Sequence, residues 1–216
     1  MLGKNSNTKN KDLYNYLKLL SEKQKIKLWI KTLISVQNNL PEIIKSVDKI
    51  IELNASSLSF VTDIYNTERS TYAQVEKVID LTERKNKLLN IYLISKNILS
   101  SIAEEDRLFL KRKFVYNWSV EDLAQEYGIS IRTVFRRTEK LIEKIYESIS
   151  KKNWSLNFIC LQVKNESWLH EKFNKFAKDS MSFSNVELNR NLESKNYIIN
   201  KTDTDYEEEE KLTSSL

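Results

Sequence analysis

Apolar residues recur at steps of three and four through most of the first 150 positions, which is the spacing of helices that bury one face. The pattern predicts three helices within residues 12–53, and the capping-box sequence "SEKQ" opens the second of them. "NNLPE" separates the second helix from the third, because Pro41 suits a first helical turn and restricts the residue before it. The preceding residues, 1–11, are expected to be disordered.

The next stretch, residues 54–70, gathers Ser, Thr and Asn without clear periodicity and is predicted to be a linker. A long helix is predicted over 71–103, and its regular part from Thr71 to Ser100 would be about 45 Å long. Seven of its positions alternate three- and four-residue steps, as in the seam of a coiled coil: Tyr72, Val75, Ile79, Thr82, Asn86, Leu89 and Leu93.

Two interpretations of this long helix are open. In the first, which we favour because two seam positions are polar, the helix packs on the N-terminal helices of its own chain. In the second, the segment Thr71–Ser100 forms a homodimer, and a buried Asn86 specifies the register of the coiled coil.

Residues 104–150 divide into three further helices with legible caps. "EEDRLFLKRKFVY" starts with acids, which favour a helix N-terminus, and Ser119 heads the capping-box pattern "SVED" of the next helix. That helix ends at Gly128, where a tight turn between crossing helices needs a positive φ. Ser130 is expected to cap the last helix, whose predicted buried stripe is Val134, Leu141, Ile145 and Ile149.

The basic residues of this last helix fall outside its apolar stripe. A helix, a tight glycine turn and a second helix with exposed arginines near its start form the helix-turn-helix arrangement, whose second helix enters the DNA major groove. Arginine suits this task because its planar fork holds guanine or phosphate with two hydrogen bonds. Residues 107–152 contain eleven Lys or Arg against six Asp or Glu, a local charge of +5. The alternative is an ordinary helical hairpin with a solvated basic face.

The stretch "LSSIAEEDRLFLKRKFVYNWSVEDLAQEYGISIRTVFRRTEKLIEKI" resembles region four of bacterial sigma factors. Its pairing with "VEKVIDLTERKNKLLNIYLISKNILSSI" is also similar to phage and prophage transcription regulators of the ArpU kind. The resemblance covers about residues 70–150, and no stretch resembles sigma region two. It implies that Ser130, Arg132, Thr133, Arg136 and Arg137 face DNA, with Lys111 and Lys113 nearer the backbone. With Ser119 and the exposed Lys140, these residues are the candidate DNA-binding set.

After Ser150 the chain changes character. Residues 151–180 place aromatic side chains among lysines, as in an amphipathic helix. This extension either binds a partner such as the polymerase or folds back on the apolar side of the hairpin, and we favour the second because aromatic side chains most often bury. Residues 181–216 are polar and predicted to be a partly disordered tail.

Composition helps to predict the fold class and the kinds of site that the chain can form. Two Gly and one Pro are too few for a sheet-rich protein, so the fold is predicted to be all-α. A single Cys160 and a single His170 form neither an intramolecular disulfide nor a zinc site. The sequence contains no phosphate-binding loop and no carboxylate pair with a supporting His. We therefore expect no enzyme, no catalytic residue, no metal and no cofactor.

Charge points to an anionic partner. Residues 201–216 carry a net charge of −4 while the whole chain carries +5, so the rest carries +9. The sequence shows neither an apolar signal core nor a membrane-span pattern, and a cytoplasmic, nucleoid-associated protein is expected. Its expected partners are double-stranded DNA and RNA polymerase, with no membrane.

The resulting expectation is an all-α DNA-binding transcription regulator that binds promoter or operator DNA. One alternative is a divergent sigma factor that recruits core RNA polymerase. Another, from a different class, is a helical protein-interaction module without DNA binding.

Overall fold

The computed structural model describes residues 5–59 and 67–182 of the 216-residue chain. The fold is all-α: the described residues form nine helices and contain no strand, as the scarcity of Gly and Pro predicted. None of these helices is long and apolar enough to cross a membrane.

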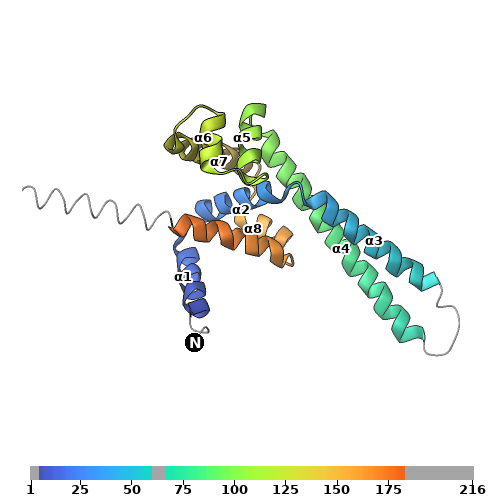
Figure 1. The fold of residues 1–216 in the computed structure, drawn as a ribbon. Helices are drawn as coiled ribbons and strands as arrows, with labels where there is room; N and C mark the ends of the chain where they lie inside the picture. Colours follow the sequence, from blue (N-terminus) through green and yellow to red (C-terminus); the bar gives the residue numbers. More distant parts are fainter. Residues whose placement is uncertain (1–4, 60–66, 183–216) are drawn as a thin grey trace, which may run out of the picture. The chain divides into compact units, whose positions relative to one another are not determined.

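The helices follow one another with short connections (Figure 1). In chain order they are α1 (Asn5–Leu19), α2 (Glu22–Val36), α3 (Leu40–Ser59), α4 (Thr67–Ser100), α5 (Glu104–Phe114), α6 (Val120–Glu126), α7 (Ile131–Ser150), α8 (Leu156–Val163) and a final helical stretch over 167–182. Leu20–Phe173 forms one compact unit, which contains α2 to α8. The helix α1 and residues 174–182 belong to a second unit.

Two predicted irregular segments are shorter than expected. The helix α1 begins at Asn5, so residues 5–11 are helical rather than disordered. The helix α3 continues to Ser59, six residues into the predicted linker 54–70. The hydroxyl of Ser56 donates a hydrogen bond of 2.8 Å to the carbonyl of Glu52, so this serine bonds back to the preceding turn instead of breaking the helix. The other parts of these segments, and the tail from 183 on, lie outside the described residues.

The helix α2 is the centre of the larger unit. Its side chains Trp29, Ile30, Leu33 and Ile34 are at most 3% exposed, and the helix packs against α4, α5, α7 and α8. The predicted N-terminal segment is therefore not separate from the predicted helix-turn-helix region, because α2 packs against α5 and α7. The sequence shows that α2 has an apolar face but not which helices will cover it.

The extension after α7 folds back within the same chain. The helix α8 packs on α4 and α2, and the ring of Phe173 stacks on that of Trp29 with centroids 4.5 Å apart. Between them Glu166, 3% exposed, accepts hydrogen bonds of 2.9 and 3.0 Å from Arg84 of α4 and one of 2.7 Å from Trp168. The extension therefore folds back within its own chain, but it covers α2 and α4, whereas the favoured interpretation placed it on the apolar side of the hairpin.

The long helix α4 lies beside α3, which runs in the opposite direction (Figure 1). Its C-terminal half also contacts α2, α7 and α8. The helix therefore packs on its own chain, as the favoured interpretation predicts. Its C-terminal end leads directly into α5, which places α5, α6 and α7 together at that end of α4 (Figure 1).

Candidate nucleic-acid interface

The turn between α6 and α7 explains why the chain keeps a glycine there. Gly128 has φ +60°, in the left-handed region that glycine adopts without a Cβ penalty. The amide of Ile129 donates to the carbonyl of Ala124 at 2.9 Å, and that of Gly128 donates to the carbonyl of Gln125 at 3.2 Å. These two bonds form a Schellman motif, which ends α6 and sends the chain toward α7.

Both helices of this hairpin begin at the residues that the sequence predicted as caps. The Ser119 hydroxyl accepts the amide of Asp122 at 3.0 Å, and the Asp122 carboxylate accepts the amide of Ser119 at 3.2 Å. The Ser130 hydroxyl accepts the amide of Thr133 at 3.2 Å and lies 2.8 Å from its hydroxyl. Ser119, Ser130 and Thr133 therefore hold the starts of the two helices, and Ser119 and Ser130 are exposed there.

The buried side of α7 sets how the helix is rotated about its axis. All four residues of the predicted stripe are buried, with Val134 and Ile145 at 0%, Ile149 at 2% and Leu141 at 5% exposure. Leu123 of α6, also at 0%, belongs to the same core. Because these side chains point inward, the remaining positions of α7 are fixed toward solvent or toward neighbouring helices.

Four cations on α7 remain free for an external partner, and the first three of them precede Lys144. Arg132, Arg136 and Lys140 are exposed and follow one another at four-residue steps, so they lie along one side of the helix. None of the four makes an ion pair or a side-chain hydrogen bond with the other residues that the structure describes. Their charge is available to an anion.

Arg137 differs from this expectation because its guanidinium turns toward α5. It donates hydrogen bonds of 2.7 Å to Glu105 and 2.9 Å to Asp106, and it lies over the rings of Phe109 and Tyr127. Burial works to lower the pKa of Arg137, but the two carboxylates outweigh it and the pKa is raised. Arg137 therefore ties α7 to α5 within the protein.

The two lysines expected near the DNA backbone, both on α5, are partly covered. Lys111 is half-buried. Lys113 donates a hydrogen bond of 3.1 Å to the hydroxyl of Thr138, and burial, helped by the nearby Lys31, lowers its pKa to about 8 against the opposing effect of Glu139. Lys113 therefore has an internal role that its place in the sequence did not indicate.

Lysines of α2 pair with two of the three acidic residues of α7, a feature that the sequence analysis missed. Lys31 pairs with Glu139 at 2.6 Å, and both Lys23 and Lys27 pair with Glu143. The pairs lie in the middle of α7, at Glu139 and Glu143, while Ser130 to Arg136 precede them in the chain. The four-residue spacing of the three lysines was the available signal, but their partners are more than 100 residues away.

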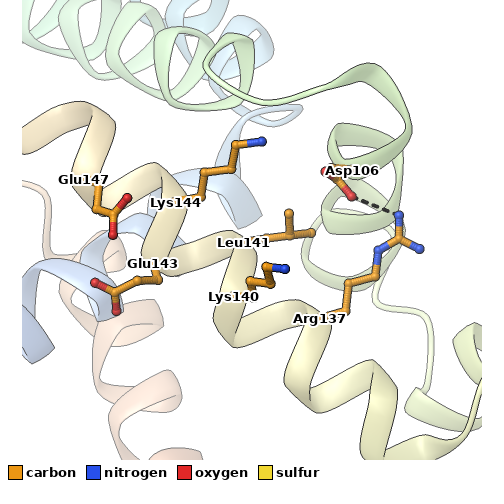
Figure 2. A pocket seen from close by; sticks show the side chains of 7 residues that line it. All are labelled: Asp106, Arg137, Lys140, Leu141, Glu143, Lys144 and Glu147. Carbon is orange, nitrogen blue, oxygen red and sulfur yellow. Dashed lines mark hydrogen bonds and ion pairs between the residues drawn. The ribbon is translucent and has the colours of Figure 1, made fainter.

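A hollow beside α7 has a volume of about 560 Å³ (Figure 2). Its lining combines three basic and three acidic side chains around Leu141, including the Asp106–Arg137 pair. The opposed charges cancel, so this hollow has no net charge with which to attract a nucleotide or another anion. No group of residues in the described part of the chain is arranged to hold a metal ion.

Exposed apolar side chains at the start of α7 and in the α5–α6 connection were also missed. Ile131, the first residue of the helix, is 46% exposed, and Tyr116 and Trp118 in the preceding α5–α6 connection are 54% and 36% exposed. Ile131 follows the cap Ser130 and lies three residues before Val134, so its spacing follows the buried stripe and nothing in the sequence indicated its exposure. An exposed apolar side chain beside arginines is suited to contact with a thymine methyl group.

Comparison of the chain with family models, with curated protein sequences and with solved structures gave no match.

Proposed function

We propose that this protein is a DNA-binding transcription regulator that places the N-terminal half of α7 in the major groove. The observation that carries the proposal is a glycine-closed helical hairpin whose second helix exposes Arg132, Arg136 and Lys140 without internal partners. The pairing of Glu139 and Glu143 with lysines of α2 adds support, because it neutralises the acids that would otherwise repel phosphate.

The residues divide into two roles in this proposal. Arg132 and Arg136 read base edges, with Ser130 and Thr133 beside them, while Lys140 contacts phosphate. Arg137, because it binds α5, positions α7 and contributes less to DNA contact than the sequence suggested.

The test begins with selection of bound sequences from random duplex DNA by the full-length protein. On the selected site, Arg136→Ala should cost about 1–3 kcal/mol of binding free energy and relax the preference at one base position. Arg136→Lys keeps the charge but loses the two-pronged hydrogen bond, so it should retain random-sequence affinity and lose the preference. Lys77→Ala, which removes an exposed cation of α4, is the matched control and should leave binding unchanged.

The selection is repeated with core RNA polymerase present. A DNA motif found only with the polymerase would favour a divergent sigma factor over a self-sufficient regulator. Absence of binding even at low salt, where phosphate contacts are strongest, would instead favour a helical protein-interaction module.

A further inference from the structure

The helix α4 carries an apolar row that no other part of the described chain covers. We call this row the α4 stripe, and it consists of the seven seam positions Tyr72, Val75, Ile79, Thr82, Asn86, Leu89 and Leu93. Its apolar members have exposed fractions of 75% for Tyr72, 40% for Val75, 54% for Ile79, 36% for Leu89 and 55% for Leu93. Five large apolar side chains on one side of one helix form more than the scattered exposure that is normal for a protein surface.

The contact with α3 uses a different row of the same helix. Lys85 pairs with Asp48 of α3 at 2.5 Å, and Leu88, one turn further along the helix, is fully buried. The α4 stripe lies one residue after this row, at Asn86 and Leu89, and one residue corresponds to a rotation of about 100° around a helix. The stripe therefore faces sideways from α3, and all seven of its positions are exposed.

We propose that the α4 stripe binds the same stripe of a second copy, as a parallel, in-register coiled coil. The three- and four-residue alternation is unbroken from Tyr72 to Leu93, a span of about 32 Å, as knobs-into-holes packing of two helices requires. A partner with a purely apolar surface would leave the amide of Asn86 without a hydrogen bond. In a parallel dimer the two Asn86 side chains face and bond each other.

The position of Asn86 also decides the direction of the two helices. The stripe is centred between Thr82 and Glu83, so an antiparallel pair in full overlap would place Asn86 opposite Ile79. Only the parallel arrangement matches polar with polar and apolar with apolar. Because α4 leads directly into α5, parallel pairing places the two helix-turn-helix hairpins at the same end of the dimer. This last consequence rests on the proposed function, since paired hairpins suit a two-fold symmetric DNA site.

The first experiment is sedimentation equilibrium of the full-length protein over a wide concentration range, without DNA. We expect a concentration-dependent dimer, and Ile79→Lys should weaken its association at least tenfold because two charges would meet in the seam. Leu161→Lys changes an exposed apolar residue of α8 and is the matched control, with association unchanged. Asn86→Ile should tighten association, whereas it would change nothing if Asn86 only faced solvent.

Orientation is tested by oxidative cross-linking. The chain has one cysteine, so the Asn86→Cys, Cys160→Ser double variant carries a single thiol in the seam. It should give a disulfide-linked dimer only when the helices are parallel and in register, because the Cα atoms must approach within about 7 Å. A strict monomer at all concentrations, a dimer that Ile79→Lys leaves intact, or failure of this cross-link would overturn the proposal.

These readouts are independent of DNA. A monomer that selects a DNA motif would remove the dimer and keep the proposed function. A dimer that binds no DNA would keep the proposed coiled coil and remove the proposed function.

Discussion

Two regions built from amphipathic helices bury different shares of their apolar surface. The first is the hairpin of α6 and α7 taken together with α5, which we call the hairpin. The second is the arm, formed by α3 with residues 67–87 of α4. In the hairpin, Phe109, Leu123 and Val134 are fully buried. In the arm, Tyr72 and Ile79 are more than half exposed, although they follow an equally regular pattern. The hairpin is covered from a third direction by α2. In the part of the chain that the structure describes, the arm has its own two helices and one contact at its base, the Arg84–Glu166 ion pair.

The difference shows what a helical pattern means in the two places. Two helices in contact each cover one side of the other, so a second apolar row on either helix needs a further partner. The hairpin obtains that partner, α2, from its own chain and should keep its structure in the monomeric protein. The arm does not obtain it, and we have proposed that a second copy supplies it.

The largest expected effect sharpens this comparison directly. Phe109→Ala should lower the free energy of unfolding by about 3–5 kcal/mol, because it removes a fully buried ring that also contacts Tyr127 and Arg137. Ile79→Ala in the arm should change it by less than about 0.5 kcal/mol when measured on dilute, monomeric protein. Urea unfolding of both variants checks the pair, and similar losses would mean that the arm is as fully packed as the hairpin.

The hairpin was more predictable from the sequence than the arm because its determinants are local. The caps Ser119 and Ser130, the glycine of the turn and the stripe from Val134 to Ile149 all act within a few residues, and the structure confirms each of them. Helix type depends on the same local rules, so the all-α class followed as well.

Features that depend on distant partners were not predictable. Arg136 and Arg137 are adjacent arginines of the same predicted helix. Only the position of α5 shows that the Arg137 guanidinium binds Glu105 while that of Arg136 is exposed. The regular spacing of the α4 stripe was recognised, but which of two adjacent rows faces α3 depends on a rotation of about 100°. Periodicity alone does not resolve that choice when both rows are partly apolar.

A smaller effect concerns the turn that makes the hairpin. Gly128→Ala should cost about 1–2 kcal/mol, since an L-residue is strained at φ +60°. A Cβ at this position would meet no atom within 4 Å, so the cost comes from the backbone alone. In the arm alanine is preferred over glycine. Ala55→Gly in α3 should lower the free energy of unfolding by about 0.5–1 kcal/mol, because glycine weakens a helix interior. Thermal unfolding followed by circular dichroism measures both, and a neutral Gly128→Ala would contradict the role of the turn.

The smallest effect compares a lysine in each region and depends on pH. Lys113 in the hairpin has its pKa lowered to about 8, mainly by burial, from the ordinary value of 10.5. Between these two values the unfolded chain binds more protons than the folded one, so this group makes stability rise as the pH increases through that window. At pH 7 the charged amine is held in a partly buried place, and Lys113→Met should raise the free energy of unfolding by about 1 kcal/mol.

The matched control is Lys85 in the arm, which pairs with the carboxylate of Asp48. Lys85→Met should lower the free energy of unfolding by less than about 1 kcal/mol. Urea unfolding at pH 7 and at pH 10 separates the outcomes. The advantage of Lys113→Met should shrink at the higher pH, because the wild-type lysine is then neutral in the folded protein. A gain that is equal at both pH values would show that the methionine improves packing and that the buried charge costs nothing. A loss at pH 7 would mean that the hydrogen bond to Thr138 outweighs the desolvation of the amine.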